Sequence, residues 1–197
     1  MILLTAIFGG GIIGWGMARW QGRIWHPPIL RMPALVVLGF LPQFLAFYMP
    51  ATRTLLSDKA ASICLVISQC LLLVYGWQNR NLPGMPWLMA GLACNLVVIL
   101  ANRGFMPLSL ETAARLVSRE ILDTLVIGAR ISKSSKDILL PDAMIWFPWL
   151  ADRFTLPSFF LYRVAFSLGD IGVSLGAFLL LVKGRTSPSI HISGDLS

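Results

Sequence analysis

Five long runs of apolar residues, separated by polar segments, constrain this chain more than any other feature of its sequence. A helix needs about 20 predominantly apolar residues to cross the hydrocarbon core of a bilayer, with roughly 17 to 25 tolerated. The five runs are close to this length, so we predict that each forms a membrane-spanning helix. The predicted spans cover residues 1–18, 33–50, 60–77, 86–101 and 164–182.

The composition agrees with this interpretation. Of the 197 residues, 56% are hydrophobic and only 13% are charged, whereas soluble domains carry about 25% charged residues. Together with the apolar runs, these values exclude an ordinary soluble domain, a disordered chain and a disulfide scaffold. The sequence therefore predicts an all-α fold: a single polytopic membrane domain over residues 1–197 with about five transmembrane helices.

The second apolar run is interrupted by Pro42, which is followed by Gln43. Proline lacks a backbone N–H and kinks or breaks a helix when it lies in the interior. We therefore expect a kinked span here, with a re-entrant segment as the alternative.

The chain is basic, with a formal net charge of +7. In a soluble protein this charge would suggest nucleic acid as a partner. Here the basic residues lie mainly between the apolar runs, where they set topology and contact anionic headgroups, and we expect no nucleic-acid partner. Six of them lie in the first loop, the third loop and the polar tail 183–197: Arg19, Arg23, Arg31, Arg80, Lys183 and Arg185. Because short cytoplasmic loops are enriched in Lys and Arg, we place the C-terminus in the cytoplasm and the N-terminus outside.

A long loop, residues 102–163, separates the fourth and fifth spans. Apolar residues recur in it with helical spacing from Leu110 to Leu125; Ser109 is placed to cap this helix and Gly128 to end it. The pattern predicts an amphipathic surface helix that lies on the membrane or covers the bundle, with a docking site for a partner as the alternative.

Two aromatic segments of the long loop, 145–149 and 156–162, are too short to cross a bilayer. We expect them at headgroup depth or at the mouth of the bundle, where aromatic side chains are enriched. A role in lipid binding or in gating is the alternative.

Asp170 lies in the fifth apolar run, about 10 Å along it at a helical rise of 1.5 Å per residue. A charge near the bilayer centre costs at least about 2.5–3.5 kcal/mol, so such a residue faces a bundle interior and finds a partner. Asn95 in the fourth run, Gln43 in the second and Gln69 in the third are candidate partners. Asp170 is then either a protonatable coupling site for transport or a structural carboxylate that ties helices together.

Small residues in the first and fifth runs have the spacing of helix-packing faces. Gly10 and Gly14, and likewise Gly172 and Gly176, are four residues apart. This GxxxG spacing lets two helices approach closely. We predict that both faces pack against other helices, in this chain or in another.

Signals of an enzyme are few. The two histidines, His26 and His191, have no metal-ligand or catalytic spacing, and the three cysteines have no zinc spacing. Asp142 and Asp152 of the long loop are possible catalytic carboxylates, but solvated loop charges are the simpler interpretation. We predict no catalytic residue, no cofactor and no metal site.

Three segments make the chain similar to a known family: 102–107 (NRGFMP), 138–142 (ILLPD) and 166–172 (FSLGDIG). With them the chain resembles the bacterial domain of unknown function 5317 family, small multi-spanning membrane proteins without an established activity. The resemblance implies a bacterial cytoplasmic membrane and a final span that contains Asp170. It supplies no substrate, cofactor or catalytic residue.

Three functions are compatible with these features. The first is a structural or accessory subunit that associates with other membrane proteins or with itself within the lipid bilayer, and we favour it. The second is a small-solute or proton-coupled carrier that uses Asp170, although no inverted repeat is visible among the five spans. The third is a membrane enzyme that acts on a lipid-linked substrate through the long loop.

Overall fold

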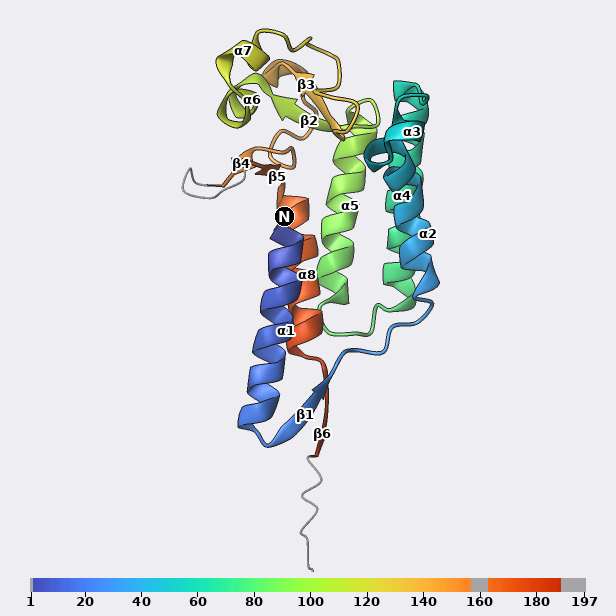
Figure 1. The fold of residues 1–197 in the computed structure, drawn as a ribbon, viewed down its shortest axis with the longest axis vertical. Coiled ribbons are helices and arrows are strands. Elements are labelled where there is room, and N and C mark those ends of the chain that lie inside the picture. The colour runs from blue at the N-terminus through green and yellow to red at the C-terminus, as the bar shows by residue number, and fades with distance from the viewer. Residues whose placement is uncertain (1, 157–162, 189–197) are drawn as a thin grey trace, which may run out of the picture.

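The long helices of the protein run side by side, and a small folded region covers one of their two ends (Figure 1). The structure is a computed structural model that describes residues 2–156 and 163–188. Helices make up 58% of it, so the fold is mostly helical, as predicted. The described part also contains three two-stranded sheets, which the all-α prediction did not include.

Five long helices occupy the five apolar runs. They are α1 (Ile2–Trp20), α2 (Ala34–Gln43), α4 (Asp58–Gln78), α5 (Met85–Ala101) and α8 (Leu168–Val182). Among the helices that the structure describes, α1 and α4 have both the length and the apolar composition needed to cross a membrane. The other three are also apolar, but they are shorter than the length typical of a membrane-spanning helix.

Helix α8 lies between α1 and α5 and packs against both. Helix α4 packs on α5, and α2 packs on α4. The helices therefore follow one another across the molecule, with α1 at one side and α2 at the other (Figure 1).

The glycine face of α1 packs against α8. A Cβ atom added to Gly10 would lie 2.8 Å from the carbonyl oxygen of Phe178, and one added to Gly14 would lie 2.6 Å from that of Leu181. Side chains larger than hydrogen do not fit at such distances, so this close approach requires glycine. The helix that this face contacts belongs to the same chain.

Helix α2 does not end at its proline. It continues into one stretch of π-helix, η1 (Phe44–Tyr48), which is followed by the short helix α3 (Pro50–Arg53). Pro42 has no N–H to donate to the preceding turn, and the wider turn begins two residues later. The distortion expected at Pro42 thus takes the form of a π-helical turn in a helix that extends over residues 34–48.

Residues 103–156, called the cap from here on, form a folded region where the sequence suggested a loop. Its centre is a parallel strand pair in which Met106 lies opposite Asp137. The elements of the cap are β2 (Met106–Ser109), α6 (Leu110–Leu116), α7 (Arg119–Leu122), β3 (Asp137–Leu140), the 3-10 turn η2 (Asp142–Met144) and β4 (Phe154–Thr155), and β4 pairs with β5 (Ala165–Phe166) after the cap.

The single amphipathic helix predicted from Leu110 to Leu125 is wrong in its length. Ser109 caps the start as expected, since its side chain accepts a hydrogen bond from the N–H of Thr112. Helix α6 then stops because Val117 is extended, and α7 begins separately. The chain then returns so that β3 pairs in parallel with β2.

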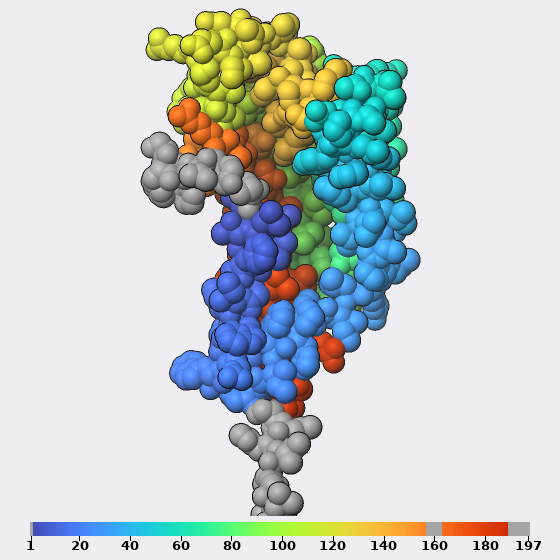
Figure 2. Space-filling model, in the orientation of Figure 1, coloured from blue at the N-terminus to red at the C-terminus, as the bar shows by residue number. Residues whose placement is uncertain are grey.

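The cap and the helices share one hydrophobic core. Ala46 and Phe47 of η1 and Leu65 of α4 are buried together with residues of the cap. The cap side chains in this core are Phe105, Met106, Ile138, Leu140, Ile145, Leu150 and Ala151. Figure 2 shows the cap, in yellow and light orange, seated directly on the helix ends. The cap is therefore an integral part of the fold.

The opposite end of the helices is closed by an antiparallel pair, β1 (Arg23–His26) and β6 (Arg185–Pro188). The indole N–H of Trp25 donates to the carbonyl oxygen of Leu181 at 3.1 Å, which joins this pair to α8. Asn79, just after α4, exchanges two hydrogen bonds with the backbone of Arg31, at 2.7 and 3.1 Å. Both contacts fix loops to helix ends.

Candidate functional site

Asp170 lies at the beginning of its helix, not inside it. The apolar run suggested a helix from Val164, but α8 begins at Leu168, so Asp170 is in the first turn. It forms a capping box with Ser167: its backbone N–H donates to the Ser167 hydroxyl at 3.1 Å, and its carboxylate accepts from the Ser167 N–H at 3.1 Å. Capping boxes satisfy N–H groups that have no partner within the helix. The sequence placed Asp170 about 10 Å along a span; this prediction is wrong, because Asp170 lies in the first turn of the helix.

Asn95 of α5 completes this arrangement. Its amide nitrogen donates to Oδ1 of Asp170 at 3.0 Å, and its amide oxygen accepts from the Ser167 hydroxyl at 3.0 Å. A Cβ atom at Gly169 would lie 2.0 Å from Oδ1 of Asn95, so only glycine leaves room for the amide. Of the three candidate partners, Asn95 contacts Asp170; among the residues that the structure describes, neither Gln43 nor Gln69 forms a hydrogen bond with it.

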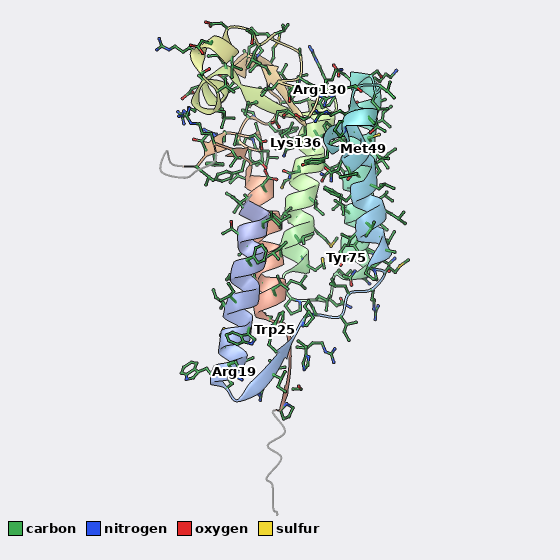
Figure 3. All side chains as sticks on the ribbon, in the orientation of Figure 1. Arg19, Trp25, Met49, Tyr75, Arg130 and Lys136 are labelled. Atoms are coloured by element: carbon green, nitrogen blue, oxygen red, sulfur yellow. The ribbon has the colours of Figure 1, made fainter. Side chains whose placement is uncertain are left out.

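Lys136 of the cap approaches Asp170 from the other side. Its ammonium lies 4.0 Å from Oδ2 of Asp170 and 3.7 Å from Oδ2 of Asp152. Figure 3 shows Lys136 where the cap meets the helix ends. The ammonium of Lys136 thus connects Asp170, at the start of α8, to Asp152 in the cap.

The acidic neighbours keep Lys136 charged. Burial would lower the pKa of this ammonium, but the charges of Asp152, Asp170 and Asp137 outweigh burial and raise the pKa above its usual value. The side chain remains 39% exposed, so water reaches part of it.

Asp152 is the most deeply buried acid of the site, with 2% of its surface exposed. Burial raises the pKa of Asp152 to about 7, although the nearby Lys136 opposes the rise. The Asp137 side chain adds to the increase as a like charge and as a hydrogen-bond partner. Burial therefore favours the protonated form of Asp152 more than water does.

A cleft of about 350 Å³ opens beside Asp152 on the surface of the cap. Its lining is largely polar, and Glu111 and Arg115 in its wall form an ion pair. The residues that line it are Ser109, Glu111, Thr112, Arg115, Asp142, Ile145, Pro148, Ala151, Asp152 and Arg153. Asp152 borders the cleft, although only 2% of its surface is exposed.

The arrangement can hold protons and opposite charges, and it ties the cap to the helices. In the part of the chain that the structure describes, no three side chains among His, Cys, Asp and Glu are grouped so that they could bind a metal ion. Asp137, Asp152 and Asp170 surround the ammonium of Lys136, which supplies the positive charge of this cluster.

We expect Ser167→Ala to lower the free energy of unfolding by about 1–2 kcal/mol, because it removes a helix cap and the donor to Asn95. Ser167 is fully buried and makes both bonds. Ser118→Ala is the matched control, since Ser118 precedes α7 without a side-chain cap bond. Thermal unfolding of the purified proteins in detergent measures both; equal losses would contradict a special role for Ser167.

The sequence interpretation missed Lys136 and Asp137 and treated Asp152 as a solvated loop charge. These residues come together only through the folding of the cap, because β3 starts at Asp137 and Asp152 pairs with Leu108 of β2. One signal was present: Ser167 and Asp170 have the S-x-x-D spacing of a capping box.

The comparisons with known proteins agree with the fold family that the sequence suggested. The model of a family of unknown function (DUF5317) matches residues 29–182, which is well over half of the chain. No curated protein and no solved structure gives a significant match. The matched residues contain the helices from α2 to α8, the cap and the Asp170 cluster. The chain therefore belongs to the DUF5317 family.

Proposed function

We propose that the protein is a multi-pass integral membrane protein in which all five long helices cross the bilayer, and that it is a structural or accessory subunit of a membrane assembly. The observation that carries the membrane assignment is the exposure of large apolar side chains. Only 17% of the apolar stretch of α1 is buried, and Phe8, Ile12 and Val37 are about two-thirds exposed. Exposed apolar surface of this extent is typical of contact with lipid or with another protein.

The dimensions support this proposal. Helix α4 has 21 residues, or about 31 Å at 1.5 Å per residue, and the hydrocarbon core is about 30 Å thick. Exposed tryptophans lie near both ends, as expected at the two membrane interfaces. They are Trp20, Trp77 and Trp87 at the β1–β6 end and Trp146 and Trp149 in the cap. The shorter helices α5 and α8 pack alongside, α5 on α4 and α8 on α5, which supports placing them in the same membrane slab.

Charge supports an orientation. Arg19, Arg23, Arg31, Arg80, Lys183 and Arg185 all belong to the β1–β6 end. No Asp or Glu accompanies them in the described residues of that end, whereas the cap carries both signs. By the enrichment of Lys and Arg in cytoplasmic loops, the β1–β6 end faces the cytoplasm and the cap faces outward. The membrane is the bacterial cytoplasmic membrane that the family resemblance implies.

The contacts of Asp170 favour the accessory role over the carrier. Both carboxylate oxygens accept hydrogen bonds inside the protein, from Asn95 and from the Ser167 N–H. These bonds hold the helix start in place, as expected for a structural carboxylate. A coupling site for transport needs a carboxylate that exchanges partners during the cycle, so Asp170 fits the structural role better.

Cysteine labelling tests the orientation. In a background with Cys64, Cys70 and Cys94 replaced by alanine, Ser134→Cys places a thiol on the cap and Asn81→Cys places one at the other end; both positions are exposed. We expect a membrane-impermeant maleimide to label the cap thiol in intact cells and the other thiol only after permeabilisation. The reverse pattern would invert the orientation, and labelling of both in intact cells would contradict a spanning topology.

Mild-detergent purification of the tagged full chain from its native membrane, followed by mass spectrometry, tests the accessory role. We expect a second membrane protein, or a second copy of this chain, in stoichiometric amount. A chain that elutes alone and monodisperse would contradict this role. Bound solute that is lost in Asp170→Asn would favour the carrier instead.

A further inference from the structure

A small pocket lies where the cap meets the start of α4. Its volume is about 250 Å³, below the roughly 300–1,000 Å³ of sites that hold drug-sized ligands. Lys59 in the first turn of α4 lines one wall, and Arg103, Phe105 and Arg130 of the cap line others. Figure 3 shows Arg130 where the cap meets the helices. We call this cavity the junction pocket; its size suits a small chemical group.

The junction pocket is positively charged. Its described lining contains three basic residues, Lys59, Arg103 and Arg130, and one acid, Asp58. The acid would repel an anion, but its carboxylate lies 3.2 Å from Nη1 of Arg130 and 2.8 Å from Nζ of Lys133. Because Asp58 is compensated by these two cations, the charges of Lys59 and Arg103 remain unbalanced.

The side chains of Lys59 and Arg103 are also without partners. Among the residues that the structure describes, the Lys59 ammonium and the Arg103 guanidinium form no hydrogen bond and no ion pair. A Cβ atom added to Gly128 would lie 3.4 Å from Nη1 of Arg103, so the guanidinium lies against another residue of the pocket wall. Both basic residues are exposed, and a ligand can therefore reach them.

The backbone at Arg103 is unusual for an arginine. Its φ is 59°, in the left-handed region that residues other than glycine rarely adopt. Glycine has no Cβ and takes this conformation without strain. Arginine thus carries a conformational cost here, and strained positions of this kind cluster at functional sites.

We propose that the junction pocket binds a phosphate group, supplied by inorganic phosphate or by the headgroup of a phosphate-bearing lipid. A phosphate monoester carries a charge of about −1.5 to −2 at pH 7 and three strong acceptor oxygens. This charge matches the two unbalanced cations. The Arg103 guanidinium can donate two N–H groups to one phosphate, while the Lys59 ammonium acts as a point charge. A carboxylate, with one charge and two oxygens, would balance only one of them.

The pocket itself is independent of the accessory role, whereas a lipid source rests on the proposed membrane crossing. The pocket lies at the start of α4 and just beyond the end of α5. The ends of spanning helices lie at the depth of the lipid headgroups, and basic pockets beside such helices bind phosphate-bearing headgroups. The two sources therefore share one site chemistry and differ in whether acyl chains are attached.

Two titrations of the full chain in a non-ionic detergent test the proposal. Calorimetry measures the binding of inorganic phosphate, and native mass spectrometry measures the retention of added phosphatidic acid, which carries a phosphate monoester on two acyl chains. We expect one saturable site in at least one titration. Lys59→Gln and Arg103→Gln should each weaken it about tenfold or more, because each removes one charged donor.

Arg119→Gln is the matched control. Arg119 is an exposed arginine of the cap in α7, and it does not line the pocket. Its replacement removes the same charge from the same end of the molecule, so affinity should stay within about twofold of the wild type. A loss equal to that of Arg103→Gln would show that diffuse charge, rather than the pocket, attracts the anion, and would overturn the proposal.

The other outcomes are equally decisive. Binding of inorganic phosphate supports the site with a soluble source, and retention of phosphatidic acid without binding of inorganic phosphate supports it with a lipid source. Absence of both overturns the proposal, as does binding of acetate with the affinity of phosphate. Neither titration depends on topology, which the cysteine labelling tests separately.

Arg103→Gly provides a readout that a merely structural role would not give. Glycine suits the left-handed backbone at this position, so the variant should unfold at a temperature no lower than that of the wild type. Its affinity for the bound phosphate should nevertheless fall as in Arg103→Gln. Loss of stability together with loss of binding would make Arg103 a structural residue and contradict its contact with the ligand.

Discussion

Replacing Gly176 with alanine is expected to lower the free energy of unfolding by about 1–3 kcal/mol or more, the cost of forcing a methyl group into a filled interface. A Cβ atom there would lie 2.4 Å from the backbone nitrogen of Leu88 and 2.7 Å from the carbonyl oxygen of Gly84. Both atoms are backbone, so no side chain can rotate away. Helices α5 and α8 must separate to admit the methyl group.

Gly16→Ala is the matched control, since Gly16 lies in α1 with no atom within 4 Å of an added Cβ. Alanine in an open helical position is expected to stabilise by about 0.5–1 kcal/mol relative to glycine. Thermal unfolding of both variants in one detergent therefore gives changes of opposite sign. Equal stabilisation by the two alanines would show that α5 and α8 are not in close contact.

The glycine spacing was the part of the packing that the sequence could predict. Gly10 and Gly14 contact α8, and Gly172 and Gly176 contact α5, because a four-residue repeat of small residues marks one face of a helix whatever it packs against. The partner helices were not predictable, since spacing does not identify the surface that fills the groove. The five long helices could be predicted, because each lies in an apolar run that is continuous in the sequence.

The cap could not be predicted because its contacts are not local. Its strands are short, and Met106 meets Asp137 across 31 positions of sequence, so no periodicity marks the pairing. The start of α8 was misplaced for a different reason: hydropathy continues through Val164, Ala165 and Phe166, although Ser167 caps a helix that begins at Leu168. The capping pattern, rather than the apolar run, locates that boundary, and with it the cluster around Asp170.

Arg130 is the second residue whose loss should be severe, because its side chain is buried and joins the cap to the helices. It is 4% exposed and lies 3.2 Å from Oδ1 of Asp58 at the start of α4. Its guanidinium stacks over the rings of Phe47 and Phe105, at 5.0 and 5.2 Å from their centroids, and donates to the carbonyl oxygen of Ser135. Figure 3 shows Arg130 above Lys136, on the cap side of the junction.

We expect Arg130→Leu to cost about 1.5–3 kcal/mol, the range for losing hydrogen bonds made by a charged group, because Arg130 itself is buried although Asp58 is half exposed. Leucine fills part of the space between the two rings but leaves the Ser135 carbonyl oxygen without its donor. Limited proteolysis should then cut the cap before the helices, because the contact that seats the cap is lost. A cap that remains protected in this variant would contradict the anchoring role.

Lys133→Ala is the control that separates burial from charge. Lys133 also pairs with Asp58, at 2.8 Å, but its side chain is 54% exposed. An exposed ion pair contributes only about 0–1 kcal/mol because water screens it. Both variants remove one positive charge beside the same carboxylate, so a simple charge effect would give similar losses. A large loss confined to Arg130→Leu would instead assign the anchoring of the cap to burial between two aromatic rings and to the hydrogen bonds made there.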